Sequence, residues 1–415
     1  MNPINKPFLP KTQPDVEAVK RQQTQDFREA MIGHKRIPTQ EGGVEIVVRE
    51  LATHMVKLGN HVDAYNRWDI FTKGGRVGGK TYHGVRIRQI PTLHNSKLNA
   101  FIYSILASVR ALFGNYDLIH YHAIGSCAMI WISKLFHKKV IVTVHGLDWQ
   151  RAKWNKFATF YLKYGERMAV KYADEIIVLS KGNQKYFLET YGRRTHLIPN
   201  GMATHTPVAA DIITAKYGLG RGDYALYLAR IVPEKGVHYL LDAFLQVKTN
   251  KRLVIAGGID WDDEYCRKIS EMAARDDRVT LAGLVQGREW EELFSNNMLY
   301  VLPSDIEGMP MSLLEAISFG CRCLVSDIPE NVDAGKGCVN TFQHSNVDDL
   351  RDKLQFLIDH PDQGQNPGDA QWEDWDTVTQ KTLDLYHEVM SPDYKPTHRE
   401  EVEAWRKARK ENQKQ

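Results

Sequence analysis

Two glutamates stand eight positions apart in the segment SDIEGMPMSLLEAISFG, residues 304–320. Glu307 falls in a glycine-marked loop after an apolar run that predicts a buried strand, and Glu315 falls two turns into the helix that follows. Pro310 suits the first helical turn, where its missing N–H costs nothing. The amides of residues 308–312 favour a phosphate or a sugar hydroxyl, and carboxylates accept hydroxyl donors. The segment predicts a site for a sugar joined to a diphosphate; a capped helix with two surface acids is the alternative.

Two cations stand close together in the segment LARIVPEKG, residues 228–236. Arg230 offers a planar fork of donors and Lys235 offers a point charge, and the two together can neutralise a diphosphate. Because they follow a predicted strand within one loop, we expect both to face the same ligand. An exposed loop with ordinary charges is the alternative.

Two further loops carry glycine at the ends of predicted strands. Gly42 and Gly43, in IPTQEGGVE, let the backbone approach a bulky ligand closely. His145, in TVHGLD, stands at a strand end where it can contact a sugar in the crevice. The alternatives are a plain turn for the glycines and a structural hydrogen bond for the histidine.

Two other patterns are rejected as sites. GGRVGGKT, residues 74–81, matches a nucleotide phosphate loop, but that motif needs a helix after it and TYHGVRIRQIP alternates like a strand. We therefore interpret the glycine pairs as a hairpin turn. His120 and His122 alternate on one predicted strand without a third ligand, so no metal site is predicted.

Short apolar strands alternate with helices in two successive runs that restart near residue 205. This alternation predicts two doubly wound α/β domains, each with a parallel sheet covered on both faces. Ligand is expected in the crevice at the carboxyl ends of the strands. The expected divisions are a loose extension at 1–28, domains at 29–205 and 206–375, a closing helix at 376–390 and a charged tail at 391–415.

Composition limits the class of protein. Of 415 residues, 43% are hydrophobic and 25% charged, which is typical of a globular chain. Five scattered cysteines favour a reducing cytosol, and neither a signal peptide nor a membrane-spanning run is found. The net charge of +3 is unevenly divided: residues 31–205 carry 25 basic and 11 acidic residues, whereas residues 206–415 carry 24 and 36. A basic half attracts anionic ligands or surfaces.

Taken together, these motifs resemble those of a known enzyme family. The strand-end arginine, the EKG triplet, the two glutamates before EAISFG, and the segments EGGVE, VHG, VLS, IPNG and SDIPEN are similar to those of retaining, GT4-type glycosyltransferases. The resemblance spans about residues 31–390 and implies the GT-B fold, two Rossmann-like domains facing each other across a cleft. It is closest to bacterial enzymes of capsular or exopolysaccharide synthesis.

The resemblance implies a role for each candidate residue. Arg230 and Lys235 would bind the donor diphosphate, Glu307 and its neighbours the transferred sugar, and Glu315 the ribose. His145 would lie near the reacting sugar. The remaining donor-binding residues implied are Gly42, Gly43, Leu284, Val285, Gly308, Met309, Pro310 and Met311, with Leu284 and Val285 against the base.

The implied reaction transfers a sugar from a nucleoside diphosphate, with a UDP-sugar favoured, and keeps the anomeric configuration. No cofactor or metal is expected, and DWDD at residues 260–263 is interpreted as a solvated helix start rather than a metal motif. A glycoside hydrolase would have no use for Arg230 and Lys235. A catalytically inactive relative that serves as a partner protein is the other alternative. No nucleic-acid partner is expected, and no oligomeric state is predicted.

The acceptor is expected to be a lipid-linked saccharide at an anionic membrane. Residues 149–171 interleave aromatic and basic side chains as membrane-surface helices do, so a cytoplasmic protein held peripherally at the inner face is predicted. The apolar helix at 96–113 is expected mainly to pack in the core. The residues predicted to contact the membrane or acceptor are Trp149, Arg151, Lys153, Trp154, Lys156 and Phe157.

Overall fold

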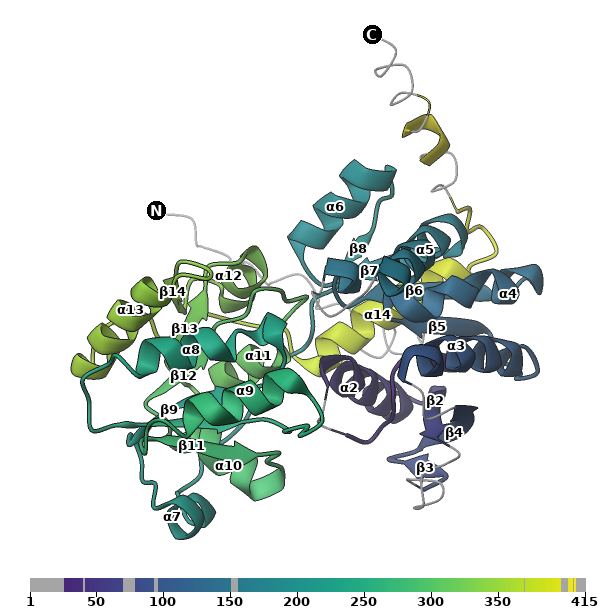
Figure 1. Cartoon of the computed structure of the whole chain (residues 1–415). Coiled ribbons are helices and arrows are strands. Elements are labelled where there is room, and N and C mark those ends of the chain that lie inside the picture. Colours follow the sequence, from purple (N-terminus) through teal and green to yellow (C-terminus); the bar gives the residue numbers. More distant parts are fainter. Residues whose placement is uncertain are drawn as a thin grey trace, which may run out of the picture.

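The computed structural model describes residues 26–39, 42–69, 79–92, 96–150, 156–368, 370–396, 402–405 and 407. These residues form two lobes, the first at the right of Figure 1 and the second at the left. Each lobe is built on one sheet, of eight strands in the first and six in the second. The predicted α/β class with two doubly wound domains is confirmed.

The first sheet has the strand order β3-β4-β2-β1-β5-β6-β7-β8, and its neighbours run parallel except for β3 and β4. The strands are β1 (Arg28–Ile32), β2 (His61–Asp69), β3 (Thr81–Tyr82), β4 (Val85–Thr92), β5 (Leu118–His122), β6 (Lys139–Val144), β7 (Glu175–Val178) and β8 (His196–Leu197). The helices are α2 (Gly43–Lys57), α3 (Ser96–Leu112), η1 (Ile124–Met129), α4 (Ile130–Leu135), η2 (Asp148–Gln150), α5 (Lys156–Tyr172) and α6 (Lys181–Tyr191).

The second sheet is wholly parallel, with the order β11-β10-β9-β12-β13-β14. Its strands are β9 (Tyr224–Leu228), β10 (Arg252–Ala256), β11 (Val279–Gly283), β12 (Leu299–Leu302), β13 (Cys323–Ser326) and β14 (Asn340–Phe342). Its helices are α7 (Ile212–Tyr217), η3 (Pro233–Lys235), α8 (Val237–Phe244), α9 (Glu264–Ala273), α10 (Gly287–Asn296), α11 (Met311–Ser318), α12 (Pro329–Gly335) and α13 (Val347–Asp359).

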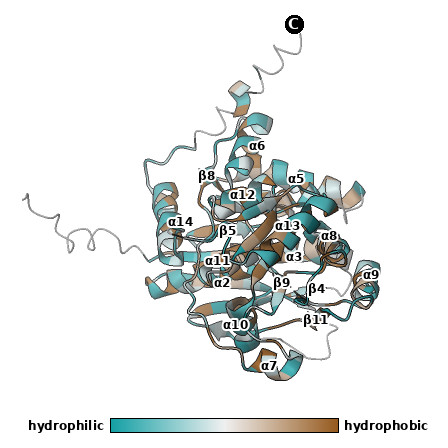
Figure 2. Cartoon of the chain, turned by 90° about the vertical axis from the view of Figure 1, so that its left-hand side faces the viewer, coloured by the Kyte–Doolittle hydropathy of each residue, from teal (hydrophilic) through white to brown (hydrophobic). Residues whose placement is uncertain are grey.

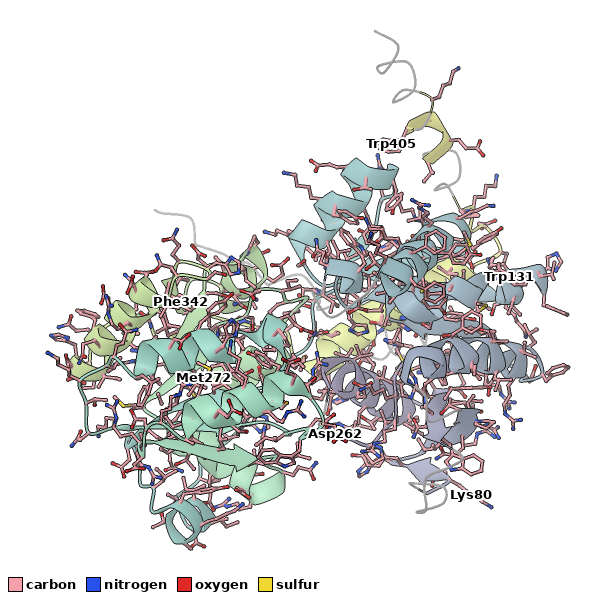
Figure 3. All side chains as sticks on the ribbon, viewed as in Figure 1. Lys80, Trp131, Asp262, Met272, Phe342 and Trp405 are labelled. Atoms are coloured by element: carbon pink, nitrogen blue, oxygen red, sulfur yellow. The ribbon has the colours of Figure 1, made fainter. Side chains whose placement is uncertain are left out.

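The central strands are apolar on both faces because helices cover both faces of each sheet, whereas β4, near the sheet edge, alternates buried and exposed residues. Every residue of β5 and of β12 is buried. In Figure 2 the hydrophobic colour follows inner strands, whereas outer helices such as α10 are largely hydrophilic. Met272 and Phe342, labelled in Figure 3, belong to one core of the second domain.

A hairpin turn follows shortly after the glycine pairs. The structure pairs β3 with β4 around His83 and Gly84, whose φ angles of 43° and 86° are both left-handed, as a two-residue hairpin turn requires. Residues 74–78 lie outside the described residues. The rejection of a phosphate loop is confirmed by its context, because a strand and not a helix follows Lys80.

The last long helix, α14 (Trp375–Met390), belongs to the first domain although it follows the second in sequence. Its apolar residues share a core cluster with those of α2 and β1, and Figure 1 shows it beside α2. The chain crosses between the domains twice at one place, where Met202 pairs with Asp374. A Cβ on Gly201 would lie 2.9 Å from the Cα of Trp375, so the two crossing segments are in close contact.

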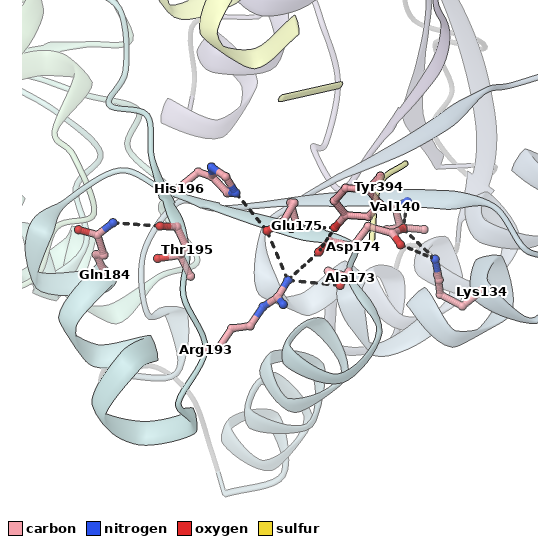
Figure 4. A network of polar contacts seen from close by, with 10 residues as sticks. All are labelled: Lys134, Val140, Ala173, Asp174, Glu175, Gln184, Arg193, Thr195, His196 and Tyr394. Carbon is pink, nitrogen blue, oxygen red and sulfur yellow. Dashed lines mark hydrogen bonds and ion pairs between the residues drawn. The ribbon is translucent and has the colours of Figure 1, made fainter. Parts of the chain in front are cut away.

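A polar network fastens the edge of the first sheet (Figure 4). The guanidinium of Arg193 donates to the carbonyl of Asp174 at 2.8 Å and lies 3.7 Å from the carboxylate of Glu175. That carboxylate also pairs with His196 and accepts a hydrogen bond from the hydroxyl of Tyr394 at 2.7 Å. The network joins β7, β8 and the chain after α14.

The predicted charged tail therefore has a packed part. Tyr394 enters the network just described, and Val402 is buried in the core of the first domain. A Cβ on Gly192 would lie 2.4 Å from the side chain of Trp405. Three packed side chains, Tyr394, Val402 and Trp405, are thus spaced widely among the charges of this tail, where no local pattern marks them.

Candidate active site

Three strand-end loops from both domains meet in one small cavity. The loop after β6 comes from the first domain, and the loops after β9 and β12 come from the second. The cavity has a volume of about 30 Å³. Its lining residues are Gly146, Leu147, Asp148, Arg230, Glu234, Lys235, Ile306, Glu307 and Gly308. Four residues predicted from separate motifs, Arg230, Lys235, Glu307 and Gly308, are thus brought together.

Lys235 and Glu307 form an ion pair inside this cavity. The ammonium lies 2.5 Å from a carboxylate oxygen of Glu307, and the side chains are 14% and 6% exposed. The same oxygen accepts a hydrogen bond from the Ser304 hydroxyl at 2.6 Å. Pairing stabilises both charges at a site that is largely withdrawn from water.

The loops after β6 and β12 touch across the domain boundary through their glycines. A Cβ on Gly308 would lie 1.6 Å from the carbonyl oxygen of His145, and one on Gly146 would lie 3.3 Å from the Cα of Gly308. Gly146 also has a φ of 153°. No larger side chain fits at Gly308 while the loops stay in this contact, so the cleft is closed here by backbone packing.

Helix α11 begins one residue later than predicted. Pro310 is its N-cap residue, and Glu315 lies little more than one turn inside the helix rather than two. The N–H groups in the first turn of the helix still have no partners inside the helix. They are therefore available to a ligand at this end of α11. Met311 and Glu315 lie on the face of α11 that points toward the first domain.

A second cavity of about 220 Å³ lies along that face of α11. It is closed by α2 from the first domain and by α10 from the second, and Met311, Glu315, Arg49 and Gly287 are among its lining residues. Burial raises the pKa of Glu315 to about 8. The positive charge of Arg49 lowers this pKa and the negative charge of Glu50 raises it further. A nucleoside has room here and not in the smaller cavity.

The loop that carries Gly42 and Gly43 reaches the start of α11. Gly42 is the extended N-cap residue of α2, and a Cβ on it would lie 2.1 Å from a carboxylate oxygen of Glu45. That carboxylate folds back to accept the amide of Lys35 at 2.8 Å. A Cβ on Gly43 would contact Met311 at 3.6 Å. The loop therefore lies against the helix predicted to bind the donor.

The ring of His145 contacts a group of buried histidines, and the small cavity begins at the next residue, Gly146; His145 itself is in neither cavity lining. Its Nε2 is 3.1 Å from Nδ1 of His122, which lies against the ring of His120. Burial lowers the pKa of His145 to about 4, with Glu45 opposing, and lowers that of His120 to about 3, so these rings are neutral at pH 7. Within the described part of the chain, no three His, Cys, Asp or Glu side chains are placed to hold a metal ion.

Six predicted donor-binding residues lie outside both cavity linings: Gly42 and Gly43 of the loop just described, Pro310 at the N-cap of α11, and Leu284, Val285 and Met309. The last three have side chains that lie elsewhere. Leu284 is half exposed at the end of β11, and Val285 is buried in the second-domain core. The sulfur of Met309 accepts the amide of Asn200 in the linker. Each of these three follows a strand or loop that does reach the cleft.

Several polar residues that line the cavities were not predicted from the sequence, among them Asp148, Glu234 and Arg49. Asp148 and Glu234 line the small cavity, and both carboxylate oxygens of the buried Glu234 lack hydrogen bonds within the described residues. Arg49 lines the second cavity from α2. Asp148 and Glu234 adjoin predicted site segments, which is a usable signal, whereas nothing local marks Arg49.

The predicted membrane residues divide three ways. Trp149 is partly buried: its indole N–H donates to the buried carboxylate of Glu166 at 2.9 Å and its ring packs on the first-domain core. Lys156 and Phe157 are exposed at the start of α5. Arg151, Lys153 and Trp154 lie outside the described residues.

Two family models match nearly all of the chain that the two domains occupy. Residues 41–206 match the model described as Glycosyltransferase Family 4, and residues 211–371 match Glycosyl transferases group 1. The matches divide where the two sheets divide.

Similar proteins of known role or structure agree with this assignment. A GDP-mannose:cellobiosyl-diphosphopolyprenol alpha-mannosyltransferase of Xanthomonas oryzae is 25% identical over 84% of this chain and 94% of its own length. The E. coli O-antigen chain mannosyltransferase B is 32% identical over 31% of this chain and 36% of its own length.

Solved structures show the same fold. Sucrose-phosphate synthase of Thermosynechococcus elongatus superposes with a TM-score of 0.74 at 19% identity, covering 88% of this chain and 98% of that one. HepE of Anabaena, solved with UDP and glucose, gives 0.70 at 16% identity, covering 87% and 99%.

Proposed function

The chain belongs to the GT4-type glycosyltransferases with the GT-B fold, and we propose that it transfers a sugar from a nucleoside diphosphate to an acceptor hydroxyl. The observation that supports this most is the shared cavity of Arg230, Lys235 and Glu307, which converge from two loops of the second domain beneath a loop of the first. Two cations beside a carboxylate match the charges of a diphosphate and the hydroxyls of a sugar.

Donor binding follows from the two cavities. The diphosphate lies at Arg230 and Lys235, whose positive charges stabilise the charge that develops on the leaving group. The sugar takes the place beside Glu307, and the ribose hydroxyls meet Glu315 in the larger cavity. Because the small cavity holds little more than a water molecule, the two domains must separate to admit the donor and close again over it.

The proposed transfer keeps the anomeric configuration. The bond between the anomeric carbon and the β-phosphate oxygen breaks, a bond to the acceptor oxygen forms on the same face, and the acceptor proton passes to the departing phosphate oxygen. No metal ion takes part in the proposed step, because Arg230, Lys235 and the start of α11 carry the stabilisation.

We propose a lipid-linked saccharide as the acceptor, with the protein cytoplasmic and peripheral at the membrane. The Xanthomonas relative is named for a diphosphopolyprenol acceptor, and the E. coli relative for an O-antigen chain. The proposed donor is a UDP-sugar. Since the first of those relatives is named for GDP-mannose, GDP-sugars belong in the same assay.

The test is release of nucleoside diphosphate from a panel of UDP-, GDP- and dTDP-sugars, with and without polyprenyl-diphosphate saccharides. One donor is expected to give acceptor-dependent release, and NMR of the product is expected to show retention. Binding of nucleoside diphosphates without turnover on any donor would instead indicate an inactive relative. An inverted product would overturn the same-face mechanism.

A further inference from the structure

Helix α3 packs Tyr103 and its small side chains in the core but leaves several large apolar side chains exposed on its outer face. The buried positions include Ser104, Ala107 and Ser108, whereas Phe101 is 38% exposed and Leu106 is 39% exposed. A helix that packs only in a core does the reverse. The prediction of plain core packing for this helix was wrong on its outer face.

The same outer face continues over α4 and α5, which pack beside α3 through η1. Trp131 projects from the outer side of the first domain in Figure 3. Exposed apolar patches of this extent mark interaction sites in proteins. Besides those of α3, the exposed side chains are Val109 (38%), Phe113 (86%), Trp131 (41%), Leu135 (67%), Phe136 (58%), Phe157 (73%), Phe160 (64%) and Tyr164 (36%).

The charge on these helices has one sign. Helices α3, α4 and α5 contain seven lysines and arginines, of which Lys134 is paired with Asp174, and a single acid, Glu166. Glu166 is fully buried and accepts hydrogen bonds from Trp149 and Tyr186. The face is therefore apolar and basic without an exposed acid, which complements an anionic lipid surface.

We propose that the outer face of α3, α4 and α5 docks on an anionic lipid bilayer. This deepens the proposed function, on which its purpose rests, because it places the active site beside the surface that carries a lipid-linked acceptor. Helix α5 begins eight residues after Asp148 of the small cavity, so the docking face and the cavity share one segment. No helix in the described part of the chain has the length and apolarity to span a bilayer, so contact is with one leaflet.

The test is co-sedimentation of the full chain with two kinds of vesicle. One is phosphatidylcholine alone, and the other contains about 30% of the anionic lipid phosphatidylglycerol. Phe113→Ser combined with Leu135→Ser and Phe136→Ser is expected to lower binding at least tenfold, and Lys163→Glu with Arg167→Glu is expected to abolish the preference for anionic lipid. Trp261→Ser with Phe356→Ser, at exposed sites of the second domain, is the matched control.

The outcomes separate this proposal from its alternatives. Equal sedimentation of the Phe113, Leu135 and Phe136 triple variant and the control overturns the proposal. A concentration-dependent dimer of the wild type that this triple variant alone loses also overturns it, because a second copy would then cover the face. Circular dichroism confirms that each variant is folded. Sedimentation needs no donor or turnover, so its result stands even if the proposed transfer fails.

A second inference rests on the pair His122 and His145. Nδ1 of His122 and Nε2 of His145 lie 3.1 Å apart, at hydrogen-bond distance, and the tautomers of the two rings decide which nitrogen donates. The other ring nitrogen of His122, Nε2, is buried and lacks a hydrogen bond within the described residues. A buried nitrogen without a partner costs less as a lone pair than as an N–H. The favoured arrangement therefore has His122 donating through Nδ1.

We infer that His122 is a positioning residue that sets the tautomer of His145. Because Nε2 of His145 accepts from His122, its proton stands on Nδ1. In the proposed transfer, on which this role rests, that N–H is the donor that the neutral ring offers to an oxygen of the substrate. Sequence reasoning assigned His122 no role beyond a rejected metal pair. Its contact with His145 supplies one.

The tautomer is measured by nitrogen-15 NMR of histidine-labelled protein, with the His145 signals identified by their loss in His145→Gln. The wild type and His122→Asn, whose amide still donates, are expected to show the Nδ1–H form; His122→Leu is expected to shift toward Nε2–H. Turnover should fall at least tenfold in His122→Leu and recover in His122→Asn, with His61→Asn as the control. An Nε2–H form in the wild type overturns the inference.

Discussion

The ion pair between Lys235 and Glu307 gives the donor-free site a defined charge state. Removing one partner of a pair that is largely withdrawn from water leaves an uncompensated charge, which is costly. A donor that brings its own diphosphate and hydroxyls can satisfy both side chains at once, so binding exchanges partners instead of leaving either charge unpaired. Glu307 then competes with a bare nucleoside diphosphate for Lys235.

Loss of Lys235 should abolish most of the transfer activity. Lys235→Ala removes a preorganised donor to the leaving diphosphate, a change worth ~10²–10³ in turnover. Initial rates with saturating donor measure it, and Lys353→Ala, at an exposed site of α13, is the control. Near-normal turnover in a folded Lys235→Ala protein would contradict the role of Lys235 at the leaving diphosphate.

Replacing Glu307 by glutamine should separate nucleotide binding from transfer. Glu307→Gln removes the competitor of the diphosphate, so affinity for UDP or GDP alone should rise, by roughly three- to tenfold if the freed charge gains ~1 kcal/mol. Transfer should fall at the same time, because the sugar loses a carboxylate. Calorimetric titration with each nucleoside diphosphate is the measurement, and weaker binding would contradict the competition.

At the scale of elements, the loops after β6 and β12 determine whether the cleft can close. Their contact runs through backbone atoms at Gly146 and Gly308, so it is sensitive to a single methyl group. The same contact brings the carbonyl of His145 to the loop that carries Glu307. The parallel strands therefore position the catalytic residues indirectly, through the lengths of two loops.

Gly308→Ala should impair catalysis more than stability. Its Cβ would lie 1.6 Å from the carbonyl oxygen of His145, and separation of the domains relieves this clash without unfolding either one. We expect transfer to fall at least ~100-fold, as for misplaced catalytic groups, with a melting temperature close to that of the wild type. Gly258→Ala, where an added Cβ meets nothing within 4 Å, is the control. A Gly308→Ala protein with full activity would show that closure is not needed.

Strand β1 carries a buried acid whose protonation should tune stability. Glu29 is fully buried, neither carboxylate oxygen has a hydrogen bond within the described residues, and burial raises its pKa to about 8, the Tyr386 hydroxyl opposing. Between the ordinary pKa and about 8 the folded state binds more protons than the unfolded state, so this residue lowers stability as pH rises through that window.

Glu29→Gln should remove that dependence. Relative to the wild type, its free energy of unfolding should rise between pH 5 and pH 8 by on the order of 1–3 kcal/mol, the cost of an unsatisfied buried group. Urea denaturation at several pH values measures it. The buried histidines have lowered pKa values, so they reduce stability as pH falls below their ordinary range. Because they are present in both proteins, their contribution cancels in the difference between the two free energies of unfolding. A constant difference between the two proteins would contradict the assignment.

At the scale of the whole molecule, the two domains are not successive pieces of sequence. After the second domain the chain returns to the first domain, where helix α14 completes the core and Trp375, Leu385 and Tyr386 are buried. The two crossings lie together at Met202 and Asp374. Both connections between the domains therefore run through one place, which suits a hinge for opening and closing.

Fragments should reveal this arrangement. Residues 206–371 contain the complete second sheet and should fold alone. Residues 26–205 lack α14 and expose the surface that it covers, at ~1.5–3 kcal/mol for each large side chain that stays unburied, so they should be unfolded or aggregate until a peptide of residues 372–415 is added. Circular dichroism and heteronuclear NMR measure both. A stably folded 26–205 fragment would contradict the shared core.

The sequence by itself determined the strands, most helices and the charged motifs of the donor site, because alternation, helical period and loop glycines are local properties. Tertiary structure alone decided which side chains meet: Lys235 with Glu307, His122 with His145, α14 with α2, and Trp149 with the buried Glu166. It also turned the apolar face of α3 outward. Periodicity tells that a helix has an apolar face but not what covers it, because burial depends on contacts between segments far apart in the chain.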